Sequence, residues 1–143
     1  RTRYSEAEER ERGIMYAEKD EVIRRADVLS LHTPLTPETR HLIGARELAM
    51  MKPTAILINT ARGAVVDEPA LVAALKDGRI AAAGLDVFEQ NDVPSPELFE
   101  LENVSLTPHI GTQTYDSRVE MVHELCNNVI GFLRGDRKID RVN

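Results

Sequence analysis

The sequence predicts an α/β fold built on a parallel, doubly wound β-sheet. Short apolar runs of strand length alternate along the chain with patterns of helical period. The run from Ile56 to Ile58 is apolar at consecutive positions, which is typical of a strand buried on both faces of a parallel sheet. The sequence contains neither an internal repeat nor a low-complexity segment, so one layered domain accounts for the pattern.

The composition excludes several classes of function. With 143 residues, of which 42% are apolar and 29% charged, the chain is of soluble globular type and can bury one sizeable core. A net charge of −6 argues against a nucleic-acid partner, which needs a basic surface. No apolar run approaches the roughly 18 residues of a membrane span, and none of the 143 residues is expected to form a signal peptide. Cys126, the lone cysteine, cannot form an internal disulfide and fits a reducing cytoplasm; its place in a helical pattern predicts a buried side chain.

The first part of the chain is expected to hold two helices and two strands. Ser5 can begin a helix, because Glu8 lies three residues later and completes a capping box. The apolar run 13–17 predicts a first strand, and 19–26 predicts a short helix. The run 28–33, which a proline follows, predicts a second strand. The inward-facing residues expected in the second helix are Val22, Ile23 and Ala26.

Helical and strand patterns continue to alternate in the middle of the chain. A helix over 45–51 should stop before Pro53, and 55–59 forms the third predicted strand. Asp67 has the residue type and position of a helix N-cap, and Gly78 is suited to the end of that helix.

The last part of the chain predicts two more strands and a long helix. Residues 81–88 and 104–107 are the strand candidates, with a polar, proline-bearing loop over 89–96 between them. From 114 to 133 the apolar residues recur at helical spacing. The stripe consists of Val119, Val122, Cys126, Val129, Ile130 and Leu133.

Polar residues follow the predicted strands where a ligand would bind. His32, Asn59 to Arg62, Asp86 and His109 each lie at a strand end, and in a parallel sheet these ends face one crevice. Arg62 presents a planar fork that pairs with carboxylate or phosphate. A lone arginine of this kind is usually a surface residue, but an acid and histidines at neighbouring strand ends favour a functional site.

Four ordered motifs carry a family resemblance. They are Leu31–Thr36 (LHTPLT), Ile58–Asp67 (INTARGAVVD), Ala83–Glu89 (AGLDVFE) and Thr107–Gly111 (TPHIG). Together they resemble the D-isomer-specific 2-hydroxyacid dehydrogenases, in particular the glyoxylate/hydroxypyruvate reductases and the D-mandelate dehydrogenases. The resemblance implies an enzyme that transfers a hydride between NAD(P)H and a small 2-keto or 2-hydroxy acid.

The same resemblance implies an incomplete Rossmann-type domain. A family member should carry G-x-G-x-x-G between its first strand and helix, and this sequence does not. We therefore expect residues 1–112 to be the C-terminal part of a dinucleotide-binding domain, without its first two strands. Residues 113–143 would be a long helix and tail leading back toward a missing substrate domain. The fragment alone would be inactive and need the missing N-terminal segment, and the longer parent would be a homodimer.

The resemblance also assigns roles to residues. Arg62 would hold the substrate carboxylate and polarise the 2-keto group, and His109 would exchange the proton. Asp86 would hydrogen-bond the nicotinamide carboxamide. The other residues expected to contact the cofactor are Thr33, Pro34, Leu35, Thr60, Ala61 and Gly111. His32 would be part of the crevice wall, whereas His41 and His123 receive no role.

Besides the missing G-x-G-x-x-G motif, two features of the sequence bear on cofactor choice and mechanism. Arg1 and Arg3 fall where the adenosine ribose is read, so NADP is favoured over NAD, although a solvated pair of arginines explains them nearly as well. Asn91 stands where the family has the glutamate that partners the catalytic histidine, and Asp92 follows it, so both are candidate partners of His109. The alternatives to an enzyme are a catalytically silent dinucleotide-sensing module, which Asn91 favours, and an inactive fragment.

Overall fold

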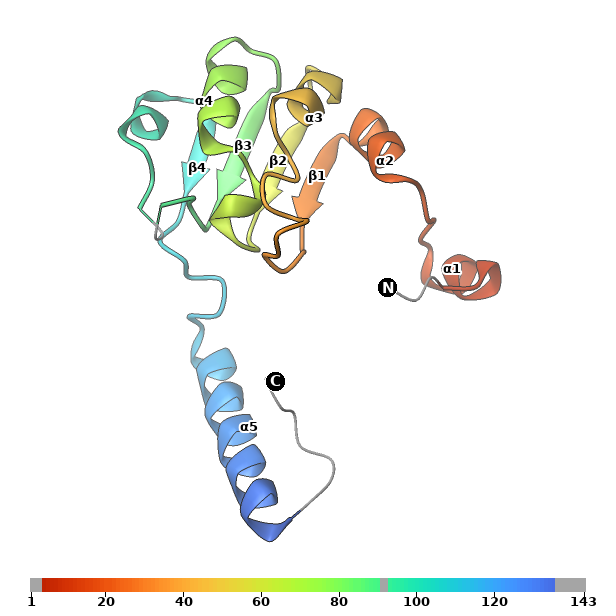
Figure 1. Ribbon diagram of the computed structural model, residues 1–143, viewed down its shortest axis with the longest axis vertical. Coiled ribbons are helices and arrows are strands. Elements are labelled where there is room, and N and C mark those ends of the chain that lie inside the picture. The colour runs from red at the N-terminus through yellow and green to blue at the C-terminus, as the bar shows by residue number, and fades with distance from the viewer. Residues whose placement is uncertain (1–3, 91–92, 136–143) are drawn as a thin grey trace. The chain divides into compact units, whose positions relative to one another are not determined.

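The computed structural model describes residues 4–90 and 93–135. The chain forms two compact units, Arg1–Pro108 and His109–Asn143 (Figure 1). The predicted domain boundary at 112/113 stays a prediction.

The first unit is built on a parallel sheet of four strands in the described residues. The strands are β1 (Val28–Leu31), β2 (Ile56–Asn59), β3 (Ala82–Leu85) and β4 (Val104–Leu106). Their order in the sheet follows their order in the chain (Figure 1), and all three neighbouring pairs are parallel. Their carboxyl ends therefore lie at one edge of the sheet, which confirms the predicted α/β class with a parallel sheet.

Helices connect the strands and cover their buried residues. The helix before β1 is α2 (Lys19–Arg25), α3 (Ala45–Met50) precedes β2, and α4 (Glu68–Lys76) links β2 to β3. Helix α3 packs against both α2 and α4. In β1, β2 and β3 every second residue is buried, and the apolar ones among them join helix side chains in one core. That core includes Ile23, Leu29, Leu31, Leu48, Leu57, Leu71, Leu75, Ala83 and Leu85.

The predicted helix caps are present. Ser5 caps α1 (Glu6–Arg12), and the Glu8 carboxylate accepts the Ser5 backbone N–H at 2.8 Å, which completes the capping box. At the start of α4 the Asp67 carboxylate accepts the Ala70 N–H at 3.0 Å. These caps place two helix beginnings where the sequence predicted them.

The strand predicted over residues 13–17 is wrong. Gly13 takes a left-handed conformation (φ 65°) at the end of α1. The next backbone donors are then satisfied locally, because Ile14 N–H donates to the Glu9 carbonyl at 2.9 Å and Tyr16 N–H to the Glu9 carboxylate at 3.2 Å. With these donors occupied, the segment forms no ladder with the sheet. Val22 was expected to face inward, but it is 40% exposed, whereas its neighbour Ile23 is buried.

The second unit contains the long helix α5 (Tyr115–Arg134), capped by Thr114. Cys126 was expected to be buried, and this was wrong: its side chain is exposed. Most of the apolar stripe is exposed with it, whereas Val119 is half-buried. In the described part of this unit α5 is the only regular element. None of the described helices is both long and apolar enough to cross a membrane.

Candidate functional site

A hollow of about 480 Å³ lies at the carboxyl ends of β1 and β2. The segment after β1 and the turn after β2 together supply its walls. Its size falls in the range of small-molecule sites, roughly 300–1,000 Å³. The hollow brings together six of the residues predicted to bind cofactor or substrate and also His32, the predicted wall residue. The six are Thr33, Pro34, Leu35, Thr60, Ala61 and Arg62.

The turn that carries Arg62 is fixed by the side chain of Asn59. Asn59 is buried at the end of β2; its Oδ1 accepts the Ala61 N–H at 3.1 Å and its Nδ2 donates to the Arg62 carbonyl at 3.1 Å. Arg62 is an exposed residue, and its guanidinium donates to the Ala61 carbonyl at 2.6 Å. Within the described ranges no carboxylate pairs with Arg62, so the other N–H groups of its fork can meet an anionic ligand.

Gly63 is required because the chain after β3 lies directly against it. A Cβ atom at Gly63 would stand 1.8 Å from the Phe88 carbonyl oxygen and 2.6 Å from the Glu89 nitrogen. Backbone atoms cannot move aside as a flexible side chain can, so only glycine fits. This contact couples the Arg62 turn to the segment that follows β3.

Asp86 lies at the end of β3, where three strands meet. It is buried; its N–H donates to the Asn59 carbonyl at 3.0 Å, and its Oδ1 accepts the Thr107 hydroxyl at 2.5 Å. So short a hydrogen bond from the hydroxyl fixes the orientation of the Asp86 carboxyl group. Thr107 begins one of the four family motifs, but the sequence alone predicts no role for it.

Glu89 is a second acidic residue of this region, and the sequence patterns predict no role for it. Its Oε1 accepts hydrogen bonds from His41 Nε2 at 2.6 Å and Arg40 Nη2 at 2.9 Å. His41, which received no role, adopts a left-handed backbone (φ 51°), and its N–H donates to the Ala64 carbonyl at 2.9 Å. Burial alone would raise the pKa of Glu89, but the bonds from His41 and the Glu68 backbone, with the charges of His41 and Arg40, lower it overall.

This lowered pKa predicts an acid-dependent loss of stability. A carboxyl group whose pKa is lower in the folded chain stabilises the fold fully above its ordinary pKa of 4.5, and the contribution is lost as the pH falls through the lowered value. The free energy of unfolding should therefore decrease as the pH is lowered from about 6 to about 3, and part of this slope comes from Glu89. We expect Glu89→Gln to remove that part of the slope. Glu97→Gln, which removes a nearby exposed carboxylate, should leave the slope in place. An unchanged slope in Glu89→Gln would contradict the assignment.

Six further predicted site residues lie either in the second unit or outside the described residues. His109 and Gly111 belong to the second unit, where His109 is exposed and has a left-handed backbone (φ 54°). Arg1, Arg3, Asn91 and Asp92 lie outside the described residues. Their roles stay predictions.

Comparisons with known proteins identify the family. The profile of the "D-isomer specific 2-hydroxyacid dehydrogenase, NAD binding domain" family matches residues 1–111. The chain belongs to this family. A glyoxylate reductase from Thermococcus litoralis is 52% identical over 143 residues, covering all of this chain and 43% of that protein.

Solved structures of the same kind share the fold. A glyoxylate reductase from Paecilomyes thermophila is 42% identical with a TM-score of 0.84, and the match covers 91% of this chain and 39% of that one. The NAD-complexed D-isomer specific 2-hydroxyacid dehydrogenase from Lactobacillus delbrueckii ssp. bulgaricus is 36% identical with a TM-score of 0.85, covering 100% of this chain and 47% of that one. The chain spans less than half the length of each of these three relatives. The family and the fold class agree with the prediction.

The described residues fit a nicotinamide dinucleotide. Thr33 lines the hollow, and its buried hydroxyl has no hydrogen-bond partner in the described part of the chain. Leu35 and Pro34 offer exposed apolar surface at the same wall. The nicotinamide is a planar ring with an amide substituent. Its ring matches the apolar surface, and its amide matches the unsatisfied hydroxyl group.

Proposed function

We propose that the protein to which this chain belongs is an NAD(P)-dependent oxidoreductase. It reduces a small 2-keto acid, such as glyoxylate or hydroxypyruvate, to the 2-hydroxy acid. The observation that carries the proposal is the hollow at the strand ends, where an exposed arginine lies beside the predicted cofactor wall in a chain of the dehydrogenase family. The glyoxylate reductase at 52% identity supports the choice of substrate class.

The residues of the first unit would bind and orient the two reactants. The nicotinamide, when bound, supplies the hydride. Arg62 holds the substrate carboxylate with its planar fork and polarises the keto oxygen. Asp86 accepts a hydrogen bond from the nicotinamide carboxamide, Thr60 and Ala61 contact the same half of the cofactor, and the segment after β1 walls the crevice. Gly111 is assigned to cofactor binding by the family resemblance alone.

His109 is proposed to donate the proton to the keto oxygen. Imidazole suits this role because it exchanges protons near neutral pH. Its partner is proposed to be Asn91, with Asp92 as the alternative. An asparagine can orient the ring but brings no charge, whereas a carboxylate would stabilise the protonated ring.

We expect Asn91→Glu to move the alkaline limb of the pH profile of kcat/KM to higher pH, because the added carboxylate keeps His109 protonated. Asp92→Asn should leave the limb in place. If Asp92→Asn alone lowers the limb, Asp92 is the partner and the assignment to Asn91 is wrong.

NADP is proposed as the preferred cofactor, because Arg1 and Arg3 offer positive charge where the family reads the adenosine ribose. Replacing both with alanine should lower the ratio of kcat/KM with NADPH to that with NADH by about tenfold, the effect of roughly one charge-assisted contact. Unchanged ratios would mean that the arginines are merely solvated.

The protein is further proposed to be a cytoplasmic homodimer. Light scattering of the purified protein tests whether it is a dimer.

The function is tested with a chimera, in which residues 1–143 replace the matching segment of Thermococcus litoralis glyoxylate reductase. The chimera supplies the parts of the enzyme that this chain does not cover. We expect it to oxidise NADPH or NADH when glyoxylate or hydroxypyruvate is added. A folded chimera that binds the dinucleotide without turnover would favour the sensing module instead, and Asn91 is the feature that would then explain it.

A further inference from the structure

We propose that the carboxylates of Glu68 and Glu89 form a clamp that positions Arg62 and Asp86 for reaction, although neither carboxylate lines the hollow. The inference rests on the proposed function, since it names positioning residues for the same site. Glu68 is the first residue of α4, and Glu89 follows β3, so the carboxylate clamp joins two strand-end segments.

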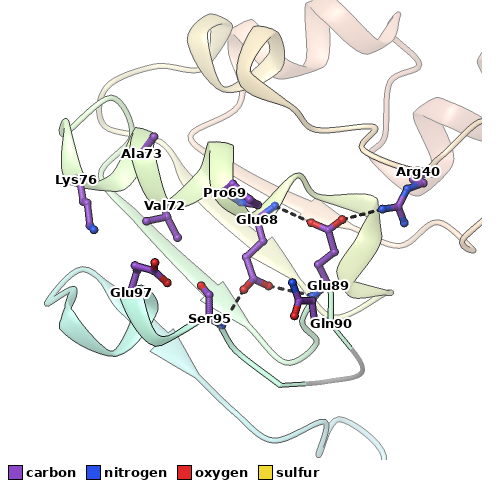
Figure 2. Close-up of a pocket in the computed structure, with 10 residues that line it drawn as sticks. All are labelled: Arg40, Glu68, Pro69, Val72, Ala73, Lys76, Glu89, Gln90, Ser95 and Glu97. Atoms are coloured by element: carbon purple, nitrogen blue, oxygen red, sulfur yellow. Dashed lines mark hydrogen bonds and ion pairs between the residues drawn. The ribbon is translucent and has the colours of Figure 1, made fainter.

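The clamp is reciprocal. Glu68 N–H donates to Glu89 Oε2 at 3.2 Å, and Glu89 N–H donates to Glu68 Oε2 at 3.0 Å. In Figure 2 the two side chains run in opposite directions, so that each carboxylate lies beside the backbone N–H of the other residue. Both residues line a cavity of about 630 Å³. Hydrogen bonds from backbone N–H to an ionised carboxylate are about twice as strong as neutral ones, so each acid holds the other's backbone firmly.

The Glu68 carboxylate also binds two backbone N–H groups, those of Glu89 and Ser95. Its Oε1 accepts the Ser95 N–H at 2.9 Å, while its Oε2 holds the N–H of Glu89. One buried side chain therefore fixes the chain on both sides of the segment between Glu89 and Ser95 (Figure 2).

The side chains of Arg40 and His41 contact the Glu89 carboxylate and offset its negative charge. Arg40 Nη2 and His41 Nε2 both reach Glu89 Oε1, and Arg40 approaches it from the side opposite Glu68 (Figure 2). His41 Nδ1 lies 3.9 Å from the Asp67 carboxylate, which caps α4. The turn before α3, the start of α4 and the segment after β3 thus share one polar network.

The clamp acts on the site through Gly63. The backbone of Gly63 is packed against Phe88 and Glu89 with no room for a Cβ atom, so the position of residues 86–89 and that of the Arg62 turn depend on each other. Asp86 begins this segment and Glu89 ends it. If the clamp is loosened, Asp86 and Arg62 lose their common support, and small misplacements of reacting groups lower turnover steeply.

The test compares Glu68→Gln, Glu89→Gln, the double variant and Glu97→Gln in the chimera. Glutamine keeps the size of the side chain but removes an acceptor that a backbone N–H needs. We expect each clamp variant to lower kcat per folded enzyme by about tenfold while KM for the keto acid stays within about threefold. The double variant should lose little more than either single one, because the two acids act as a unit. Glu97 lines the same cavity, and its variant is the matched control for charge.

A second readout does not depend on turnover. Amide hydrogen exchange of the same variants should be faster at residues 62–63 and 86–89 in the clamp variants and unchanged in Glu97→Gln. A lowered melting temperature with kcat within twofold of the unsubstituted chimera would mean a purely structural role and overturn the proposal. If the unsubstituted chimera is folded but inactive, the proposed function is wrong. Exchange then decides the clamp separately: faster exchange at residues 62–63 in Glu68→Gln supports the clamp, and unchanged exchange there contradicts it.

Discussion

Arg62→Lys in the chimera should lower kcat/KM for the 2-keto acid at least a hundredfold, about 3 kcal/mol of transition-state stabilisation. Lysine keeps the positive charge but lacks the planar fork, so the carboxylate would be held at one point and the keto group would swing away from the hydride donor. Steady-state kinetics with NADPH and glyoxylate measure the loss. Binding of the dinucleotide alone should change little, because the role of Arg62 is toward the substrate.

The control for this substitution is Arg25→Lys. Arg25 lies on α2 and pairs with Glu21 one helical turn away at 2.7 Å, an exposed ion pair of little energetic weight. Its variant should keep the kinetics of the unsubstituted chimera. An Arg62→Lys chimera within threefold of the unsubstituted one would refute the role assigned to Arg62.

Gly63→Ala should destabilise the folded chimera by about 3 kcal/mol or more, beyond the usual cost of an overpacked site. The added Cβ atom would stand 1.8 Å from the Phe88 carbonyl oxygen, so two backbone segments would have to separate. Urea unfolding monitored by circular dichroism measures the change in the free energy of unfolding. The protein that remains folded should also lose activity, because the Arg62 turn moves with Gly63.

Gly44→Ala is the matched control, since a Cβ atom there would meet its nearest neighbours at 3.7 and 3.8 Å, which is ordinary contact. We expect its stability to stay within about 1 kcal/mol of the unsubstituted chimera, as at other sites with room for a methyl group. A Gly63→Ala variant as stable as Gly44→Ala would show that the two strand-end segments are not in contact in solution.

The sequence predicted the elements whose signals are local. The apolar run before Asn59, the cap at Asp67 and the capping box at Ser5 each depend on residues within one turn or strand, and the structure has all three. The gathering of the residues after β1 with the turn at Arg62 could also be predicted, because parallel strands bring their carboxyl ends to one edge.

The missed features depend on partners distant in the sequence. Glu68 and Glu89 are 21 residues apart, and His41 and Glu89 are 48 apart, so no periodicity or motif spacing links them. Read locally, Glu68 looks like an acid that favours the start of a helix. The run after Gly13 failed as a strand for a related reason: its apolar pattern was suitable, but Glu9 occupies the backbone donors that a ladder would need.

The central claim is that a hydride passes to C2 of a 2-keto acid at this site. It is tested most directly by supplying the chimera with hydroxypyruvate and NADPH carrying deuterium at C4 of the nicotinamide, and analysing the glycerate by NMR and mass spectrometry. We predict one deuterium at C2 of the glycerate, transferred from a single face of the ring, and glycerate of the D configuration. Glycerate without deuterium at C2 from either face-labelled cofactor, or oxidation of the cofactor without formation of glycerate, would contradict the proposed function.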